Sequence, residues 1–215
     1  MNHARRRLMS GLLLLLAPLF VAFAADSPEF KEGVHYQRIP TPVPTSTGDK
    51  IEVAEIFWYG CPHCYALEPT VTEWLKRKPD NVVFIQLPAT LGRKPGEAHA
   101  RAFYTAETLG ILDQINKRIM AAMHVEKRRV DSEDQLAAFF VEQGVSEEDF
   151  RNTYNSFVVE TKFRRSQDLI KRYQVNGVPA IVVNGKYLTN ASMAGSQEQL
   201  FEVVDFLVQQ EAKAG

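Results

Sequence analysis

Apolar and polar residues alternate along residues 51–59, and this pattern predicts a β-strand, because successive side chains of a strand point to opposite faces of a sheet. Ile51, Val53 and Phe57 define one apolar face of this strand. Glu55 falls on that same face, so alternation alone directs its carboxyl group inward.

A helix is predicted to follow this strand, and a second strand to follow the helix. Cys61 stands where a helix N-cap would, and Pro62 suits the first helical position because its missing N–H leaves no hydrogen bond unmade. We expect this helix to run to about Arg77. The apolar run over residues 82–87 then predicts a second, buried strand.

The pattern becomes helical from about residue 95 to residue 173. Ile111, Ile115 and Ile119 recur at a four-residue spacing, and Ser132 and Ser146 stand at capping positions before later helical segments. This stretch therefore predicts several consecutive helices.

Strand signals return near the end of the chain. Residues 180–183 are apolar, and Asn184-Gly185 is typical of a two-residue hairpin turn, which leads into a further strand at residues 186–188. A last amphipathic helix is expected near residues 197–210.

This order of elements predicts the α/β class: a βαβ half and a ββα half around one sheet, with helices inserted between them. We expect residues 25–94 and 166–215 to form the two parts of the sheet domain. Residues 95–165 are expected to form the helical insertion.

The first 24 residues match the three regions of a secretory signal peptide. Three arginines at positions 5–7 precede an apolar stretch over residues 12–23, and the small residue Ala24 suits a cleavage site. A membrane anchor is the alternative, but this stretch is shorter than the roughly 20 residues that span a bilayer. Cleavage after Ala24 leaves 22 basic and 26 acidic side chains, and this charge balance indicates no nucleic-acid partner.

The mature chain has two cysteines, Cys61 and Cys64, and their C-x-x-C spacing directs attention to redox chemistry. At a helix N-terminus, unpaired N–H groups and the positive end of the helix dipole stabilise a thiolate on the first cysteine. Cys61 is therefore the predicted nucleophile and Cys64 the resolving thiol. No separate cofactor is expected beyond their disulfide.

Three other roles are open to a cysteine pair of this spacing. A zinc site requires further Cys or His ligands, and the other candidates, His35, His99 and His124, are scattered and expected to be surface or packing residues, so no metal site is predicted. Covalent haem attachment requires a histidine at position 65, where Tyr65 stands. A structural disulfide closing so short a loop adds little stability.

Three ionisable side chains near the pair are candidates for tuning it. His63 lies between the cysteines, where an imidazole can stabilise a thiolate. Glu55 is predicted to point inward, and Glu68 lies on the helical face of Cys61 and Cys64, so either acid could relay a proton to or from Cys64. The alternative for both acids is an ordinary solvated carboxylate.

Val178-Pro179 directly precedes the strand at residues 180–183, where a cis peptide bond would fit a tight turn into the sheet, although the sequence alone favours trans.

Two segments, residues 57–65 (FWYGCPHCY) and residues 177–187 (GVPAIVVNGKY), closely resemble the DsbA family of bacterial periplasmic thiol:disulfide oxidases, and the similarity extends over nearly the whole mature chain. The resemblance implies a thioredoxin fold with an inserted helical domain and a cis Pro179 facing the active site. With this placement, we expect the backbone of Val178 and Pro179 to pair with an extended substrate segment beside Cys61. Glu55 and Glu68 match the acids of the family near its buried cysteine. The active-site lysine of the family has no counterpart in the strand at residues 83–88, which leaves the charge balance around Cys64 open.

The resemblance also implies partners and a location. The expected substrates are reduced, unfolded exported polypeptides, which would receive the Cys61–Cys64 disulfide in the periplasm, and a membrane reoxidase of the DsbB type would restore it. A monomer is expected, since no segment is spare for the dimerisation region of disulfide isomerases or reductases, which are the alternative within the same chemistry. A peptide-binding or chaperone module without thiol chemistry is the alternative from another class.

Overall fold

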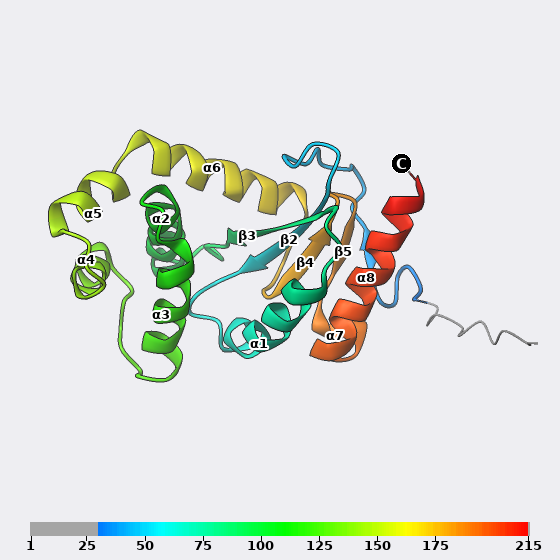
Figure 1. Ribbon diagram of the computed structural model, residues 1–215, viewed down its shortest axis with the longest axis horizontal. Coiled ribbons are helices and arrows are strands. Elements are labelled where there is room, and N and C mark those ends of the chain that lie inside the picture. Colours follow the sequence, from blue (N-terminus) through cyan, green and yellow to red (C-terminus); the bar gives the residue numbers. More distant parts are fainter. Residues whose placement is uncertain (1–29, 215) are drawn as a thin grey trace, which may run out of the picture.

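The computed structural model describes residues 30–214, which form one five-stranded sheet flanked by helices (Figure 1). The strand order is β1-β5-β4-β2-β3. Strand β3 pairs with β2 in parallel, and the other pairs are antiparallel. The strands are β1 (Gln37–Arg38), β2 (Ile51–Phe57), β3 (Val82–Pro88), β4 (Ala180–Val183) and β5 (Tyr187–Thr189).

Eight helices accompany the sheet in this part of the chain. They are α1 (Pro62–Arg77), α2 (Lys94–Thr108), α3 (Leu112–His124), α4 (Glu133–Glu142), α5 (Glu147–Tyr154), α6 (Phe157–Arg172), α7 (Ala191–Ala194) and α8 (Gln197–Ala214). The element order confirms the predicted α/β class with helices inserted between the two halves of the sheet.

The two faces of the sheet are covered by different helices. Val53 packs with side chains of α1 and α8, whereas Ile56, on the other face of β2, packs with residues from the C-terminal part of α6. Every residue of β2 is buried because this strand lies between two neighbours and under helices on both faces. Glu55 shares the face of Val53 and is 1% exposed, as the alternation predicts.

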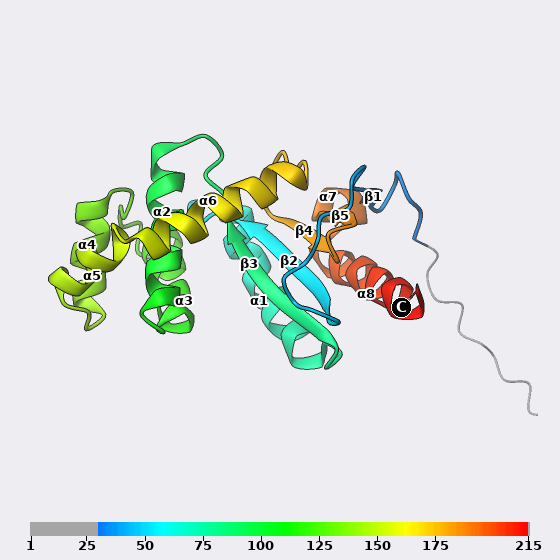
Figure 2. The same cartoon turned by 90° about the horizontal axis from the view of Figure 1, so that it is seen from above.

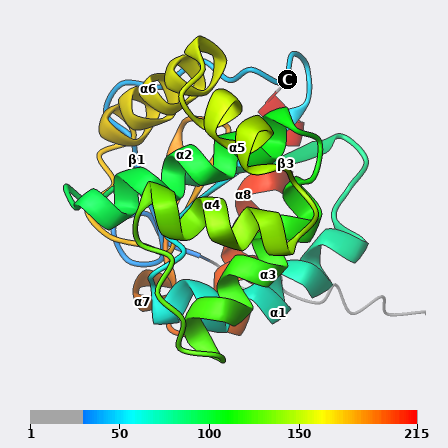
Figure 3. The same cartoon turned by 90° about the vertical axis from the view of Figure 1, so that its left-hand side faces the viewer.

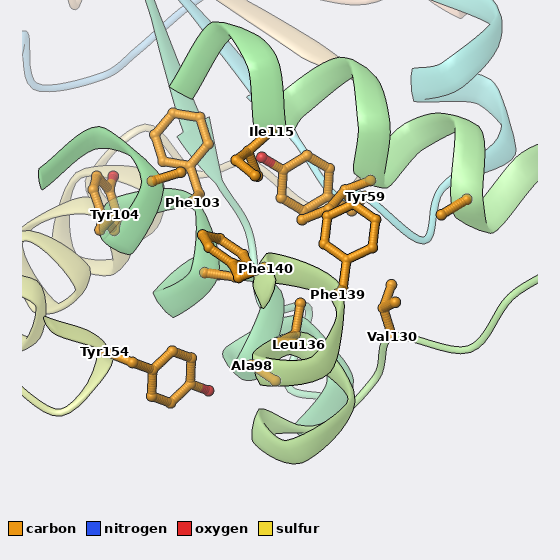
Figure 4. Packing of buried hydrophobic residues seen from close by; sticks show 14 of the residues in the cluster. Tyr59, Ala98, Phe103, Tyr104, Ile115, Val130, Leu136, Phe139, Phe140 and Tyr154 are labelled. Carbon is orange, nitrogen blue, oxygen red and sulfur yellow. The ribbon is translucent and has the colours of Figure 1, made fainter. Parts of the chain in front are cut away.

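Helices α2 to α5 form a separate layer beside the sheet (Figures 1 and 3). Their apolar core is rich in aromatic side chains, among them Phe103, Phe139 and Phe140 (Figure 4). The same buried cluster includes Tyr59, Cys61 and Cys64, so the inserted helices pack directly on the segment that carries the cysteines.

Helix α6 runs without a break from the end of α5 to the sheet (Figure 2). The expected boundary of the insertion at residue 165 therefore falls within a single helix, whose first half contacts α2 and whose second half covers the sheet.

The local signals are largely confirmed. Ser132 and Ser146 are N-caps of α4 and α5. Asn184 and Gly185 both have positive φ, 50° and 62°, as the hairpin turn requires, although pairing resumes only at Tyr187.

The prediction that residues 82–87 form a buried strand is wrong in one respect. Strand β3 is present, but it lies at the edge of the sheet, and its residues 83–86 are only half-buried. A run of apolar residues does not distinguish an edge strand from a central one, because the number of neighbouring strands is a property of the whole sheet.

The predicted signal peptide and its cleavage site lie outside the described residues. Within residues 30–214, none of the helices combines the length and the apolar character that crossing a membrane would require.

Candidate active site

Cys61 lies at the N-cap of α1, at the end of the short loop that follows β2. Its backbone is extended (φ −90°, ψ 114°), and its Sγ accepts a hydrogen bond from the backbone N–H of Cys64 at 3.4 Å. Pro62 occupies the first turn of the helix, as predicted. Gly60 directly precedes Cys61. A Cβ at this position would lie 2.4 Å from the ring of Trp58, so the loop as folded requires glycine there.

The two thiols differ sharply in environment. Both are free thiols in the structure, and Cys61 is 7% exposed whereas Cys64 is 0% exposed. A hydrogen bond from the Cys64 thiol is the main reason that the pKa of Cys61 falls from 9.0 to about 6, and the backbone N–H groups of Cys64 and His63 lower it further. The same hydrogen bond and burial strongly raise the pKa of Cys64. At neutral pH the pair therefore carries its negative charge on Cys61.

His63 is exposed beside this thiolate. The charge of its imidazolium also lowers the pKa of Cys61, but it is the smallest of the causes that do so. The side chain therefore adds to a thiolate that the helix N-terminus already stabilises.

Val178 and Pro179 face the nucleophile. Their peptide bond is cis, which confirms the expectation drawn from the resemblance, and the carbonyl oxygen of Val178 lies 3.5 Å from Cys61 Sγ. A groove of about 430 Å³ begins here and is lined by His63, Val178, Pro179 and residues of the loop after β5, including Asn190. The groove therefore lies beside the loop whose carbonyl group contacts Cys61.

Glu55 is a buried acid beneath the cysteines. Burial raises the pKa of Glu55 to about 8, and a hydrogen bond from Gln86 Nε2 to its Oε2 at 2.9 Å opposes that rise. The charge of Glu55 in turn contributes to the raised pKa of Cys64. Glu55 is therefore protonated at neutral pH and close enough to Cys64 to influence it.

Glu68 is half-buried on α1, and burial raises its pKa while the positive charge of Lys117 opposes the rise. It lines a groove of about 510 Å³ between α1, β3 and α3, together with Gln86 and Asn116. The charge of Glu68 also raises the pKa of Glu55, so the two acids that were predicted from sequence interact electrostatically.

Gln86 lies in β3, the strand in which the sequence shows no counterpart of the family's lysine. Its amide faces Glu55 from the adjacent strand, at the residue paired with Glu55 in the β2–β3 register. The charge balance that the sequence leaves open is therefore decided by an uncharged hydrogen-bond donor instead of a cation.

Two histidines that seemed ordinary in the sequence hold the active-site loop. His124 Nε2 lies 2.7 Å from the carbonyl oxygen of Tyr59, and its ring stacks on Tyr65 with centroids 4.9 Å apart. His99 Nδ1 accepts the indole N–H of Trp58 at 2.9 Å. No spacing in the sequence connects either histidine to the loop, because both come from the inserted helices.

Among residues 30–214, no group of three or more His, Cys, Asp or Glu side chains is arranged to hold a metal ion.

The chain is similar to known proteins over nearly its whole length. Residues 52–202 match the family described as the DSBA-like thioredoxin domain. The thiol:disulfide interchange protein DsbA of Pseudomonas aeruginosa is 38% identical over 209 residues, covering 97% of this chain and 98% of that protein. DsbA of Pseudomonas syringae pv. tomato is 37% identical over 209 residues, covering 97% of each.

A solved structure agrees with these sequence matches. The crystal structure of Pseudomonas aeruginosa DsbA superposes with a TM-score of 0.81 at 38% identity, covering 86% of this chain and 96% of that one. The match confirms the expected thioredoxin fold with a helical insertion. The chain therefore belongs to the DsbA family and is a thiol:disulfide oxidoreductase whose redox-active pair is Cys61 and Cys64.

Proposed function

We propose that the protein is an exported oxidase that passes the Cys61–Cys64 disulfide to reduced polypeptides. In the first step a substrate thiolate attacks Cys61 Sγ, the Cys61–Cys64 bond breaks, and Cys64 leaves with the electron pair. Cys64 has a strongly raised pKa and takes up a proton. Glu55, whose pKa of about 8 keeps it protonated at pH 7, is the proposed donor.

In the second step another thiolate of the substrate attacks the substrate sulfur of the mixed disulfide. The substrate gains a disulfide, and Cys61 leaves as a thiolate. A low pKa makes Cys61 a good leaving group, which favours release of an oxidised substrate.

During reoxidation the proton moves in the opposite direction, away from Cys64. Cys64 must lose its proton to attack the mixed disulfide that Cys61 forms with an oxidant, and ionised Glu55 is the proposed base. Glu68 lies in the groove between α1, β3 and α3 and is the proposed link from Glu55 towards solvent.

The partners follow from this chemistry and from the family. The groove beside Val178 and Pro179 suits an extended, unfolded segment, and we propose that its backbone pairs with Val178 while its cysteine reaches Cys61. We also propose removal of residues 1–24 on export, a periplasmic location, action as a monomer, and reoxidation by a membrane protein of the DsbB type. Residues 25–94 and 166–215 would then form the catalytic domain, and residues 95–165 the insertion.

The observation that carries this proposal is the geometry of the two thiols at one helix N-terminus: Cys61 Sγ accepts the backbone N–H of Cys64, whereas the Cys64 side chain is fully buried. This arrangement lowers the pKa of Cys61 and raises that of Cys64.

The test starts from Cys64→Ala and Cys61→Ala whose remaining thiol has first been converted to a mixed disulfide with glutathione. Reduced, unfolded polypeptides with one cysteine are then added. Stable mixed disulfides with the polypeptide are expected for Cys64→Ala alone, because the polypeptide thiolate attacks Cys61 Sγ, glutathione leaves, and the thiol that would resolve the adduct is gone.

The direction of the reaction is tested by equilibration of the protein with glutathione. An oxidase must form a disulfide that glutathione reduces readily. A disulfide that resists reduction by excess glutathione, or adducts that accumulate on Cys61→Ala instead, would contradict the proposal.

A further inference from the structure

A chain of three hydrogen bonds leads from the buried Glu55 to the inserted helices. Gln86 Nε2 donates to Glu55 Oε2 at 2.9 Å, and Asn116 Nδ2 donates to Gln86 Oε1 at 2.9 Å. The hydroxyl of Tyr59 donates to Asn116 Oδ1. The chain joins β2, β3, α3 and the active-site loop.

The direction of this chain is determined at its Tyr59 end. Burial raises the pKa of Tyr59, so its hydroxyl stays protonated and is a hydrogen-bond donor. Figure 4 shows its ring among apolar side chains of the insertion. Because Asn116 accepts from Tyr59 with Oδ1, its NH₂ group is left to face Gln86 Oε1, and Gln86 must then present its own NH₂ group to Glu55.

The orientation of the Gln86 amide matters to the acid. An N–H directed at Glu55 stabilises the ionised carboxylate, whereas the flipped amide would present an oxygen and favour the protonated form. Gln86 does oppose the rise that burial causes in the pKa of Glu55. Without Asn116, nothing in the chain of bonds would select one orientation of Gln86 over the other.

Among the groups around Glu55, the Gln86 amide is the contact whose orientation can change. The titratable groups that act on the acid directly are Cys64 and Glu68 on α1, and Glu68 in turn interacts with Tyr59 on the loop and with Lys117 on α3. Strands β3 and β4 place the uncharged Gln86 and Ile181 opposite Glu55. Gln86 and Asn116 line the groove between α1, β3 and α3, whereas Glu55 itself is 1% exposed.

We propose that Asn116 and Tyr59 are positioning residues that hold the Gln86 amide against Glu55 and thereby control proton exchange between Glu55 and Cys64. The inserted helices thus contribute to the chemistry of the buried thiol through Glu55. This inference rests on the proposed role of Glu55 as the acid and base for Cys64.

The test isolates the step in which Cys64 must lose its proton. Glutathione is attached to Cys61 as a mixed disulfide, and its release by Cys64 is followed as a function of pH. Tyr59→Phe removes only the hydroxyl, and Asn116→Leu removes the amide at nearly constant volume. In both variants the midpoint of the pH–rate profile should move up by about one unit, which makes release at pH 7 roughly tenfold slower.

Three controls separate positioning from a general structural effect. The exposed Asn152 on α5 provides a matched substitution, Asn152→Leu, which should leave the profile unchanged. Thiolate titration of Cys61 should be the same in all variants, since the chain of bonds does not reach it. Gln86→Leu should shift the midpoint as Asn116→Leu does, and the double variant should shift it no further, because Asn116 acts through Gln86.

Two outcomes overturn the inference and are distinguishable. Suppose that Tyr59→Phe and Asn116→Leu keep the wild-type midpoint while Glu55→Gln abolishes the pH dependence. Glu55 then has the proposed role, but Tyr59 and Asn116 do not position the Gln86 amide for it. If Glu55→Gln leaves the profile unchanged, the proposed relay itself fails, and the inference fails with it.

Discussion

Trp58 donates its indole N–H to Nδ1 of His99, 41 positions further along the chain, at 2.9 Å. Because Nδ1 accepts, Nε2 carries the ring proton and donates to the carbonyl oxygen of Val130 at 3.0 Å. The neutral imidazole thus holds the residue that leads into the active-site loop. A protonated ring could not accept from Trp58, so this contact requires the uncharged form of His99.

The first prediction is a loss of stability in acid that depends on His99. Burial lowers the pKa of His99 to about 4, despite Asp131 at 3.8 Å from Nε2. The stabilisation is complete above the unfolded pKa of about 6.5 and is lost as pH falls towards 4, by about 3 kcal/mol in all. His99→Gln keeps an acceptor for Trp58 and does not titrate. The free energy of unfolding, measured with urea between pH 4 and 7, should change less with pH in this variant than in the wild type. An equal pH dependence in the two proteins would count against the prediction.

The second prediction concerns the relative stability of the two redox forms. The disulfide closes a four-residue loop and stabilises the oxidised form by about 2 kcal/mol. The Cys61 thiolate, with its pKa of about 6, stabilises the reduced form by about 1.5 kcal/mol at pH 7 and about 2.5 kcal/mol at pH 8. A lowered pKa gives stability that is complete above the unfolded value of about 8.5 and is lost as pH falls through 6.

The oxidised form should therefore be the more stable at pH 5, the two should be nearly equal a little above pH 7, and the reduced form should gain the advantage at pH 8. Guanidinium unfolding of both forms at these pH values measures the difference. The double variant Cys61→Ala/Cys64→Ala supplies the baseline without thiols. A difference that does not change with pH would show that Cys61 is not a stabilised thiolate.

The third prediction is that Glu55→Gln stabilises the folded protein while impairing its proton exchange with Cys64. A raised acid pKa contributes stability below the unfolded value of about 4.3 that is lost as pH rises towards the folded value of about 8, a cost on the order of 3 kcal/mol at neutral pH. The variant should therefore gain stability over the wild type between pH 5 and 8, measured by urea unfolding.

Glu52 is the matched control for this substitution. It is also a buried acid of β2, but its carboxylate accepts hydrogen bonds from the backbone N–H and the hydroxyl of Ser46. Glu52→Gln should bring no gain because these donors already satisfy the charge. Equal gains from both variants would point to a general effect of removing negative charge.

The fourth prediction is a modest effect of His63. Replacing it with valine should raise the Cys61 pKa by less than about one unit, since the charge of the imidazolium is the smallest of the lowering causes and the backbone N–H groups remain. Thiolate titration by ultraviolet absorbance measures this shift, and His35→Leu provides a control at a remote histidine. An upward shift of several units would mean that His63, and not the helix N-terminus, sustains the thiolate.

Features that depend on neighbours along the chain could be predicted before the fold was known. The C-x-x-C spacing with Pro62 predicts a nucleophile at a helix N-cap, and the Asn184-Gly185 pair predicts the hairpin turn. Alternation along β2 directs Glu55 inward. Each of these follows from backbone geometry within a few residues, which any fold that contains the element must respect.

The surroundings of the buried acid depend instead on tertiary packing. Gln86 and Asn116 lie 31 and 57 positions from their respective partners, Glu55 and Tyr59, and they meet because β3 pairs with β2 while α3 packs against the active-site loop. The apolar run of β3 likewise did not indicate that this strand lies at the edge of the sheet, where the groove beside Gln86 opens. Such contacts depend on how whole elements pack, and no local period or spacing encodes them.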